Sequence, residues 1–393
     1  MINSKGIVIV GGFLGLLPIG GAVWDYVQYV IGFRMMGYDV YYLEDTKIYP
    51  VFGKVWNDST DTVNRLLDIM KFFGLEDRYI YRDELTQQIF GKSKREYLEL
   101  CKAADIFINV SCANVIREEY SHIPVRILLD TDPMFTQIQI NSNQSFTTGN
   151  GNLKELAEWH THHFTFGENI FGKDCLIPRG EFSWIPTRQP ICMDFWKYKE
   201  LDFLESSYTT LMNWKAGKKF HYKGQNWGQK DVTFPLILNL PNLLPQISFK
   251  LAVSQTGGGA NEGQLNKLLE NGWNIISPEE ASGDHLLYQE FIYSSGGEIS
   301  VAKETYVKAK TGWFSCRSAC YLASGRPVVT QETGWSEFYP TGLGLFSFTD
   351  EKEAEEAIQK ISSNWKAHSM GARELAKTYF DHSVVLGKLI DSL

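Results

Sequence analysis

Residues 301–344 constrain the fold of this chain more than any other segment, because signals for helices and strands alternate along them. Gly325 can end a helix over residues 316–324, and Pro327 sets the chain extended for the apolar strand that follows. The loop 331–335 leaves the carboxyl end of that strand, which is the edge where open α/β sheets bind ligands. The segment therefore predicts part of a doubly wound α/β domain with a ligand site at the end of its strand.

This loop and its surroundings carry groups suited to a phosphate. The backbone N–H groups of Thr333, Gly334 and Ser336 are predicted to face phosphate oxygens at the start of a following helix. Arg317, near the start of the preceding helix, has the planar guanidinium that pairs with phosphate, and Lys303 adds a point charge. The alternative interpretation is an ordinary turn at Gly334 and two solvated cations.

The same segment resembles the donor half of GT-B glycosyltransferases of the family 1 and family 4 kind. In them a helix rich in small residues, an A-x-G-x-P-V-V turn and a glycine-bearing loop hold the nucleotide sugar. Residues 323–329 (ASGRPVV) and the pair Thr333-Gly334 match these elements. The resemblance implies an α/β fold of two Rossmann-like doubly wound domains that face each other across a cleft. Cys320 and Gly312 stand where the best-known retaining branch has two glutamates, so neither that branch nor its stereochemistry is implied.

The resemblance also implies further donor-binding residues. Many GT-B proteins carry a lysine toward the donor phosphates from the loop after the first strand of the second domain. Lys230 is our candidate for it, and Lys215 is the competitor. Glu298 is predicted to contact the ribose or to cap a helix. Aromatic faces stack on sugars, and Trp335 beside Gly334 is the predicted platform.

A length of 393 residues exceeds what one hydrophobic core usually organises, so we expect two domains. The proline-marked segment 184–190 is the predicted crossing between them. An acceptor-side domain over residues 1–185 and a donor-side domain over residues 186–365 follow from that boundary. In the fold that the resemblance implies, helices over residues 366–393 pack back toward the first domain.

The amino terminus reads as a strand over residues 7–10, a glycine loop over residues 11–21 and a helix over residues 22–37. In the glycosyltransferase interpretation this loop lies across the cleft from the donor, where its backbone approaches sugar or acceptor. The candidates on the acceptor side are Gly11, Gly12, Gly20 and Gly21.

The glycine loop also supports a rival interpretation, a site for NAD. Glu44 and Asp45 end the second predicted strand, where a dinucleotide site has its acidic residue. The glycines fit less well, because Val10 stands where the first glycine of Gly-x-Gly-x-x-Gly belongs. The loop is also longer than the tight dinucleotide turn.

Two carboxylates are candidates for catalysis. Asp132 follows the predicted strand 125–129, and Asp25 stands near the start of the helix after the glycine loop. A carboxylate at such an edge suits a general base or a sugar-orienting group. The alternative is that Asp132 and its neighbour Asp130 are turn residues.

The cluster His160-Thr161-His162-His163 raises the question of a metal. No carboxylate or cysteine stands at a spacing that completes a site, so we expect none. The resemblance likewise implies a leaving diphosphate stabilised by side chains and helix ends, without a cofactor. His163 is instead a candidate sugar contact.

The net charge of −8 argues against a nucleic-acid partner. The six cysteines are scattered in apolar surroundings, as in reduced cytosolic proteins. Lys5 and the apolar residues after it are similar to a signal peptide, but glycines and a proline interrupt them. We therefore expect a cytoplasmic protein without a transmembrane segment.

The sequence thus predicts a glycosyltransferase that moves a sugar from a nucleoside diphosphate donor to an unidentified small-molecule or glycan acceptor. A nucleotide-sugar epimerase of the same fold, an NAD-dependent oxidoreductase and a non-catalytic nucleotide-sugar-binding protein stay open as alternatives. The sugar, the base and the oligomeric state depend on shapes that no spacing reveals.

Overall fold

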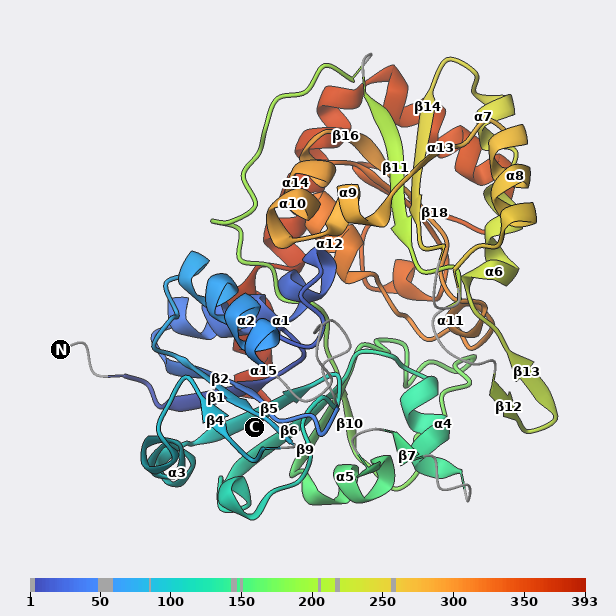
Figure 1. Ribbon diagram of the computed structural model, residues 1–393. Helices are drawn as coiled ribbons and strands as arrows, with labels where there is room; N and C mark the ends of the chain where they lie inside the picture. Colours follow the sequence, from blue (N-terminus) through green and yellow to red (C-terminus); the bar gives the residue numbers. More distant parts are fainter. Residues whose placement is uncertain are drawn as a thin grey trace. The chain divides into compact units, whose positions relative to one another are not determined.

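The computed structural model describes residues 4–48, 59–84, 86–142, 147–148, 151–203, 206–215, 220–255 and 259–393. The chain divides into two compact units (Figure 1). Unit 1 consists of Met1–Phe166, Pro178–Cys192 and His382–Leu393, and unit 2 consists of Gly167–Ile177 and Met193–Asp381.

Unit 1 contains an eight-stranded sheet with the strand order β10-β9-β6-β5-β1-β2-β3-β4. Its strands are β1 (Ile7–Gly11), β2 (Asp39–Glu44), β3 (Tyr79–Arg82), β4 (Ile89–Phe90), β5 (Ile106–Val110), β6 (Val125–Asp130), β9 (His162–Thr165) and β10 (Trp184–Pro186). Only the pairing of β4 with β3 is antiparallel among these strands. The order of the strands reverses at β1, whose neighbours are β2 and β5. The loops after β1 and β5 therefore diverge, which makes this the switch point of the sheet.

Helices cover both faces of this sheet, so its central strands are apolar on both sides. The helices are α1 (Gly20–Met35), α2 (Thr60–Phe72), α3 (Lys94–Ala103), α4 (Phe135–Asn141), α5 (Leu153–Trp159) and α15 (His382–Asp391), with the 3-10 turn η1 (Glu118–Tyr120). Figure 1 shows α1, α2 and α15 on one face and α3 and α5 on the other. Ile9 and Phe107 join Tyr97 of α3 in one buried cluster on the second face. A short hairpin, β7 (Thr147–Thr148) with β8 (Gly151–Asn152), precedes α5.

Unit 2 contains a six-stranded parallel sheet with the strand order β15-β14-β11-β16-β17-β18. Its strands are β11 (Ser207–Met212), β14 (Ser248–Val253), β15 (Asn274–Ile276), β16 (Ser295–Ser300), β17 (Val328–Gln331) and β18 (Leu345–Phe348), with a separate hairpin of β12 (Phe220–Tyr222) and β13 (Gln225–Trp227). The order reverses at β11, so the switch point of this unit lies between β11 and β16.

The helices of unit 2 also cover both faces of its sheet. They are α6 (Lys230–Thr233), η3 (Phe234–Ile237), α7 (Leu240–Leu243), α8 (Glu262–Glu270), α9 (Pro278–Ser282), α10 (His285–Tyr293), α11 (Glu304–Lys308), α12 (Cys316–Ala323), η4 (Trp335–Glu337), α13 (Glu351–Ser363) and α14 (Trp365–Tyr379). In Figure 1, α7, α8 and α13 lie on one face, and α9, α10, α12 and α14 lie on the other. Phe234, Leu268 and Ile358 pack against the first face in one buried core.

The helix, turn and strand predicted around Gly325 are present. Gly325 has a φ of +70°, and the Arg326 N–H donates to the Tyr321 carbonyl (2.9 Å), which closes the end of α12. The next two residues lead into β17, which is buried along its whole length. The local signals of this segment therefore located both elements.

The division into units differs from the predicted domain ranges. Residues 178–192 stay with unit 1, because Trp184 pairs with His163 and the Thr187 N–H donates to the Thr165 carbonyl (2.8 Å). The proline-marked segment is thus an edge strand of the first sheet, a position that tolerates the missing N–H of proline. Residues 167–177 belong instead to unit 2.

The carboxyl-terminal helices also divide between the units. α14 packs against α12 within unit 2. α15, the last helix of the chain, belongs to unit 1 and packs against α1. The His382 N–H donates to the Ile191 carbonyl (2.9 Å), and a Cβ on Gly32 of α1 would lie 2.8 Å from Leu386. The predicted block 366–393 is therefore split after residue 381.

Candidate functional site

Four charged residues from separate segments meet at the switch point of unit 2. Arg317, the second residue of α12, donates from Nε to Glu298 Oε1 (2.6 Å) and from Nη1 to the Leu211 carbonyl at the end of β11. Glu298 lies on β16 and its side chain is fully buried. Burial lowers the pKa of Arg317, but the carboxylate of Glu298 outweighs this effect and raises the pKa overall. The guanidinium therefore stays charged at the carboxyl ends of β11 and β16.

Lys230 begins α6 at the end of the segment that follows β11. Its pKa lies well below the usual value, first because of burial and then because Arg317 and Lys303 are also positive, whereas Glu298 acts in the opposite direction. The described residues place no carboxylate in an ion pair with Lys230. Lys230 thus lies partly buried among other cations, where an anionic ligand would stabilise its charged form.

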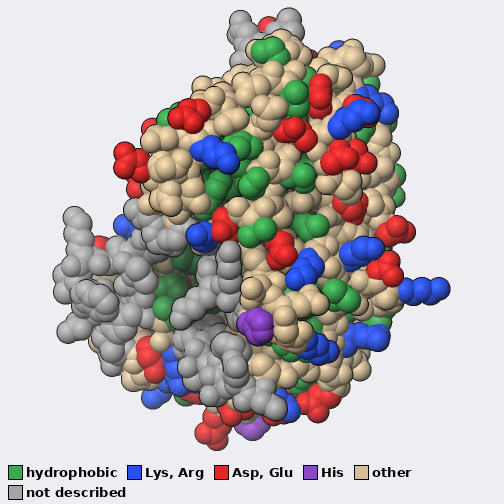
Figure 2. Space-filling model, turned by 90° about the vertical axis from the view of Figure 1, so that its right-hand side faces the viewer, with side chains coloured by type: hydrophobic (Ala, Val, Ile, Leu, Met, Phe, Trp, Pro, Cys, Tyr) green, Lys and Arg blue, Asp and Glu red, His purple; other side chains and the backbone are tan. Residues whose placement is uncertain are grey.

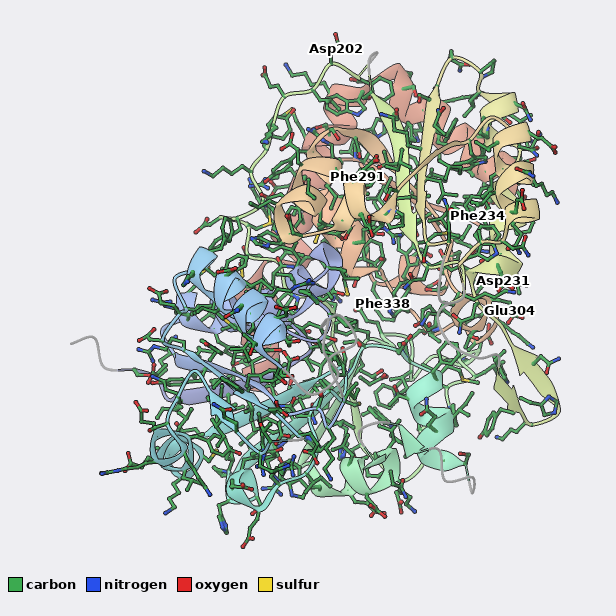
Figure 3. All side chains as sticks on the ribbon, viewed as in Figure 1. Asp202, Asp231, Phe234, Phe291, Glu304 and Phe338 are labelled. Atoms are coloured by element: carbon green, nitrogen blue, oxygen red, sulfur yellow. The ribbon has the colours of Figure 1, made fainter. Side chains whose placement is uncertain are left out.

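The loop before Lys230 is held in place by the start of α11. Glu304 Oε2 accepts the Gly228 N–H (2.7 Å), and Thr305 Oγ1 donates to the Gly228 carbonyl (2.8 Å). Figure 3 shows Asp231 of α6 close to Glu304 at this edge of unit 2. The sequence analysis missed Glu304, because its partner is far away in the chain and the only local signal is an acidic residue in a first helical turn.

Lys303 belongs to the same edge. It is the residue before α11, is partly buried, and its Nζ lies 5.1 Å from the centroid of the Tyr306 ring. Among the charges that act on Lys230, Arg317 and Lys303 are positive and Glu298 is negative. Helix α12 adds the positive end of its dipole, since Ser315 at its N-cap makes no side-chain capping bond. The switch point of unit 2 is therefore electropositive.

Two buried polar atoms at this site lack a hydrogen-bond partner among the described residues. They are Arg317 Nη2, a donor, and Glu298 Oε2, an acceptor. Unpaired buried polar atoms are rare, because desolvating them costs about 1–3 kcal/mol each.

Two of the three N–H groups that were predicted to face phosphate are bonded within the loop. Glu332 Oε1 accepts the N–H of Gly334 (2.5 Å) and that of Ser336 (3.5 Å), and Thr333 Oγ1 donates to the Trp313 carbonyl (2.7 Å). The element that follows is the single 3-10 turn η4, not an α-helix. The assignment of Gly334 and Ser336 as phosphate donors is therefore corrected, because Glu332 accepts both N–H groups, whereas that of Thr333 stays a prediction.

Neighbouring segments also cover this loop. The Gly312 N–H donates to the Thr333 carbonyl (2.7 Å), and a Cβ on Gly334 would lie 3.1 Å from Asn169 Nδ2. Asn169 is fixed in turn by the Lys310 carbonyl, which accepts from its Nδ2 (2.8 Å). Gly334 has a φ of +95°, a left-handed conformation that favours glycine, and it packs against Asn169 of the segment 167–177.

Trp335 is not a sugar platform. Its side chain is 1% exposed, and its Nε1 donates to the Gln331 carbonyl (3.0 Å). The ring packs edge-on against Phe314, with 5.4 Å between centroids, and also contacts Tyr339. The prediction that Trp335 stacks on a sugar is therefore corrected, because its indole ring is enclosed in the core.

Glu298 also differs from its prediction as a ribose contact or helix cap. It lies within β16, where it pairs with Thr209 of β11 and Val328 of β17, and its side chain has no exposed surface. Its contact is with Arg317, as described above.

In unit 1 the residues of the dinucleotide interpretation are used by the protein itself. Glu44 accepts the N–H groups of Gly15 and Leu16 (2.7 Å each) and the hydroxyl of Tyr42 (2.6 Å). Burial raises the pKa of Glu44 to about 7, against the lowering effect of these bonds. Glu44 therefore holds the glycine loop closed instead of facing a ribose.

Asp45 is similarly occupied. Its two oxygens accept from Nη2 (2.8 Å) and Nε (2.9 Å) of Arg117, which also contacts Glu84. Because Glu44 and Asp45 are both bonded within the protein, neither is free to contact the ribose of NAD. The glycines of the loop already departed from the Gly-x-Gly-x-x-Gly motif.

The glycines at the amino-terminal loop have packing roles. A Cβ on Gly11 would lie 2.7 Å from Asn114 Nδ2, and one on Gly12 would lie 2.7 Å from the Tyr26 ring. Gly20 and Gly21 are the first residues of α1, whose N-cap Ile19 makes no side-chain capping bond. Close packing thus explains Gly11 and Gly12, whereas contact of Gly20 and Gly21 with an acceptor stays a prediction.

The candidate carboxylates lie on two segments of unit 1. Asp132 is partly exposed in the loop after β6, at the carboxyl edge of the sheet. Its neighbour Asp130 is fully buried and accepts from Gln137 Nε2 (2.7 Å), Thr165 Oγ1 (2.7 Å) and the Asp132 N–H (3.0 Å), and burial raises its pKa. Asp25 is partly buried in α1, and its carbonyl accepts from Gln189 Nε2 (3.0 Å). Asp130 is thus structural, and Asp132 and Asp25 stay candidates.

Strained backbone gathers in the same loops of unit 1. Ser111 and Cys112, just after β5, and Met134, after β6, have φ values of +58°, +55° and +72°. Such conformations cost about 1–3 kcal/mol each and are found preferentially near functional sites. The loops around Asp132 at the carboxyl edge of the sheet therefore have strained backbone, which no local sequence signal indicated.

His163 is not placed to contact a sugar. It lies near the start of β9, and its Nε2 donates to the Ala157 carbonyl (2.7 Å) while its ring packs against Phe182 and Trp184. Burial lowers its pKa, and lowers that of His160 to about 3. The prediction for His163 is therefore corrected, because the carboxyl edge of a parallel sheet is at the opposite end of the strand.

In the part of the chain that the structure describes, no three His, Cys, Asp or Glu side chains are grouped closely enough to hold a metal ion. None of the described helices is long and apolar enough to span a membrane. On the face shown in Figure 2, acidic and basic side chains are interspersed.

Two doubly wound parallel units, with a positively charged switch point in the second, define the GT-B class of fold. The solved structures that align with nearly the whole chain include three examples. The first is HepE of Anabaena in complex with UDP-glucose, with a TM-score of 0.58 and 12% identity over 99% of this chain and 100% of that one. The second is an alpha-glucosyltransferase in complex with UDP and a 13-mer DNA containing an HMU base, with a TM-score of 0.58 and 11% identity over 99% of each chain. The third is the sucrose-phosphate synthase of Thermosynechococcus elongatus, with a TM-score of 0.53 and 11% identity over 98% of each chain.

This similarity shows that the chain has the GT-B fold of these enzymes. No protein-family model matches the sequence, and no curated protein matches it significantly. The fold is thus established by structure alone, and the activity is argued from the site.

Proposed function

We propose that this protein is a glycosyltransferase that binds a nucleoside diphosphate sugar at the switch point of unit 2 and transfers the sugar to an acceptor hydroxyl. One observation carries the proposal: the positive charges of Arg317 and Lys303 both act on Lys230, so three cations lie near one another there. A diphosphate carries the matching negative charge and acceptor oxygens. HepE and the alpha-glucosyltransferase, which have the same fold, were solved with UDP-glucose or UDP.

In this proposal the residues of unit 2 provide electrostatic stabilisation. Negative charge grows on the diphosphate as the bond to the sugar breaks, and fixed cations stabilise that charge most in the transition state. Arg317 and Lys230 would supply this stabilisation without a metal cofactor. Asp132, and after it Asp25, is the proposed base that takes the proton of the acceptor hydroxyl.

The remaining parts of the proposal concern partners and location. The net charge of −8 and the mixed surface charges favour a small-molecule or glycan acceptor over a polyanion. All six cysteines are free thiols, as expected in a reducing cytoplasm.

The first test is ligand binding measured as a thermal shift with UDP, GDP, ADP, dTDP, CDP and NAD. A ligand that binds the folded state raises the melting temperature. We expect a shift with one nucleoside diphosphate, and a loss of affinity of about 10- to 100-fold in Arg317→Ala and Lys230→Ala, since each removes a charged hydrogen bond. A shift with NAD alone would support the oxidoreductase instead.

The matched control is Lys215→Ala. Lys215 is the rival lysine of the same segment, but its side chain is 44% exposed and pairs with Asp231 (3.6 Å). We expect this variant to bind as the wild type does. Equal losses in both lysine variants would mean a general effect of surface charge.

Turnover separates the remaining alternatives. With the nucleotide sugar whose base gave the shift, a transferase forms a glycoside only when an acceptor is present, whereas an epimerase converts the donor alone. Binding without either reaction would support the non-catalytic alternative, which the absence of the glutamate pair at Gly312 and Cys320 keeps open.

A further inference from the structure

A buried glutamate stands in the middle of the parallel sheet of unit 2. Glu298 is on β16, between β11 and β17, and no part of its side chain is exposed. Burying a lone carboxylate is strongly unfavourable, so the residue at this position is expected to have a specific partner. That partner is Arg317, at 2.6 Å.

Glu298 determines where the guanidinium of Arg317 lies. The bond to Nε and the bond from Nη1 to the Leu211 carbonyl hold two of its three nitrogens. The third, Nη2, is buried and has no hydrogen-bond partner among the described residues. An arginine held in this way loses little side-chain entropy when a ligand binds, so its guanidinium is preorganised.

Glu298 also acts on Lys230. Burial and the charges of Arg317 and Lys303 lower the pKa of Lys230, and the negative charge of Glu298 opposes them. Removing the carboxylate would therefore lower the pKa of Lys230 further.

We propose that Glu298 is a positioning residue, which fixes Arg317 for the diphosphate of the donor. This inference rests on the proposed function of the same site. It replaces the predicted contact between Glu298 and ribose with an indirect role, carried through the guanidinium of Arg317.

The test compares the binding of UDP, and of inorganic pyrophosphate as a probe independent of the base, from pH 6 to pH 9. Glu298→Gln keeps the size of the side chain and removes its charge. We expect the affinity of this variant at pH 8 to fall about tenfold or more, and its loss of binding at high pH to begin at a lower pH than in the wild type.

Two further variants separate positioning from general damage. In a Lys230→Arg background the side chain at position 230 stays charged, so Glu298→Gln should no longer shift the pH profile. Asp130→Asn removes another fully buried carboxylate, in unit 1, and is expected to leave pyrophosphate binding unchanged. A shift of the profile that persists in the Lys230→Arg background would contradict the effect of Glu298 on the pKa of Lys230.

The proposal is overturned if Glu298→Gln binds both probes with the affinity and pH profile of the wild type. Should that variant fail to fold, Arg317→Lys takes its place: it keeps the charge but lacks the Nε–H that Glu298 accepts, and wild-type affinity in it overturns the proposal equally. If wild-type protein binds neither UDP nor pyrophosphate, nor any nucleotide of the thermal-shift panel, the proposed function fails, and the role of Glu298 with it.

Discussion

At the residue scale, the buried carboxylates of this protein behave according to their partners. Glu298 faces a guanidinium, whereas Glu44 is surrounded by two backbone N–H groups and the hydroxyl of Tyr42. Neutral donors stabilise a charge less than a cation does, so burial dominates at Glu44 and raises its pKa to about 7. Glu44 thus makes the stability of unit 1 depend on pH.

The sign of this dependence follows from the direction of the shift. Because the folded protein holds the Glu44 proton more tightly than the unfolded chain, the contribution is complete below about pH 4.5 and is lost as the pH rises through about 7. The difference corresponds to roughly 3 kcal/mol in the free energy of unfolding. We expect Glu44→Gln to flatten this part of the profile relative to wild type in urea unfolding between pH 5 and pH 8.

Glu99→Gln, which removes a carboxylate that is 60% exposed and paired with Arg95, controls for the loss of one negative charge. It should leave the slope as in the wild type. If Glu44→Gln and Glu99→Gln have the same profile, Glu44 does not titrate in this range.

Individual residues also show how far sequence reasoning reaches. Arg317 and Lys303 were chosen from their places on two helices and Lys230 from the resemblance, and the charges of Arg317 and Lys303 act on Lys230 in the structure, while their role at a donor site stays a prediction. The parallel sheet explains this, because the carboxyl ends of its strands share one edge. Trp335 was misjudged because local sequence does not show that Phe314 and Tyr339 enclose its ring.

At the scale of elements, the contact between α1 and α15 joins two segments from opposite ends of the chain. Gly32 of α1 gives Leu386 of α15 the space to approach, since a Cβ there would lie 2.8 Å from its Cδ1. Gly387 lies on the same helix α15, but a Cβ there would have no atom within 4 Å. The two glycines therefore have different reasons to be glycine.

This contrast gives a paired prediction. Gly32→Ala is expected to destabilise the protein by about 1 kcal/mol, because overpacking at the contact outweighs the better helix propensity of alanine. Gly387→Ala is expected to stabilise it by roughly 0.5–1 kcal/mol through propensity alone. Urea unfolding of the two variants checks the signs, and a stabilising Gly32→Ala would show that α15 does not pack closely on α1.

At the scale of the whole molecule, the proposal places the nucleoside diphosphate on unit 2. Hydrogen exchange should therefore slow on adding the nucleotide in peptides that cover residues 226–233 and 301–317, because binding stabilises those segments against local opening. The loop over residues 12–19 in unit 1 serves as the internal comparison. Slower exchange in that loop alone would favour the dinucleotide interpretation over the donor site.

The division of the chain into units is a property of the whole molecule that local signals represented only in part. Two prolines in residues 184–190 indicated an extended segment, and the segment is extended, but as the edge strand β10 of unit 1. Its hydrogen bonds to β9 decide its membership, and such pairing depends on residues elsewhere in the chain. Residues 167–177 pass to unit 2 for the same reason.

The sequence by itself determined the elements and the class of fold. Gly325 and Pro327 fixed the end of α12 and the start of β17 through backbone dihedral angles, which are local properties. The helix and strand periodicity, with the resemblance of residues 323–329, was enough to predict the GT-B fold that the solved structures share.

Only the tertiary structure decided which polar groups are left for a ligand. Glu332 takes the N–H groups of Gly334 and Ser336, and Glu44 takes those of Gly15 and Leu16, so two glycine loops that looked open are closed by their own protein. Hydrogen-bond satisfaction and burial depend on every segment that reaches a site. For that reason the electropositive switch point of unit 2 became identifiable once β11, β16 and α12 were placed together.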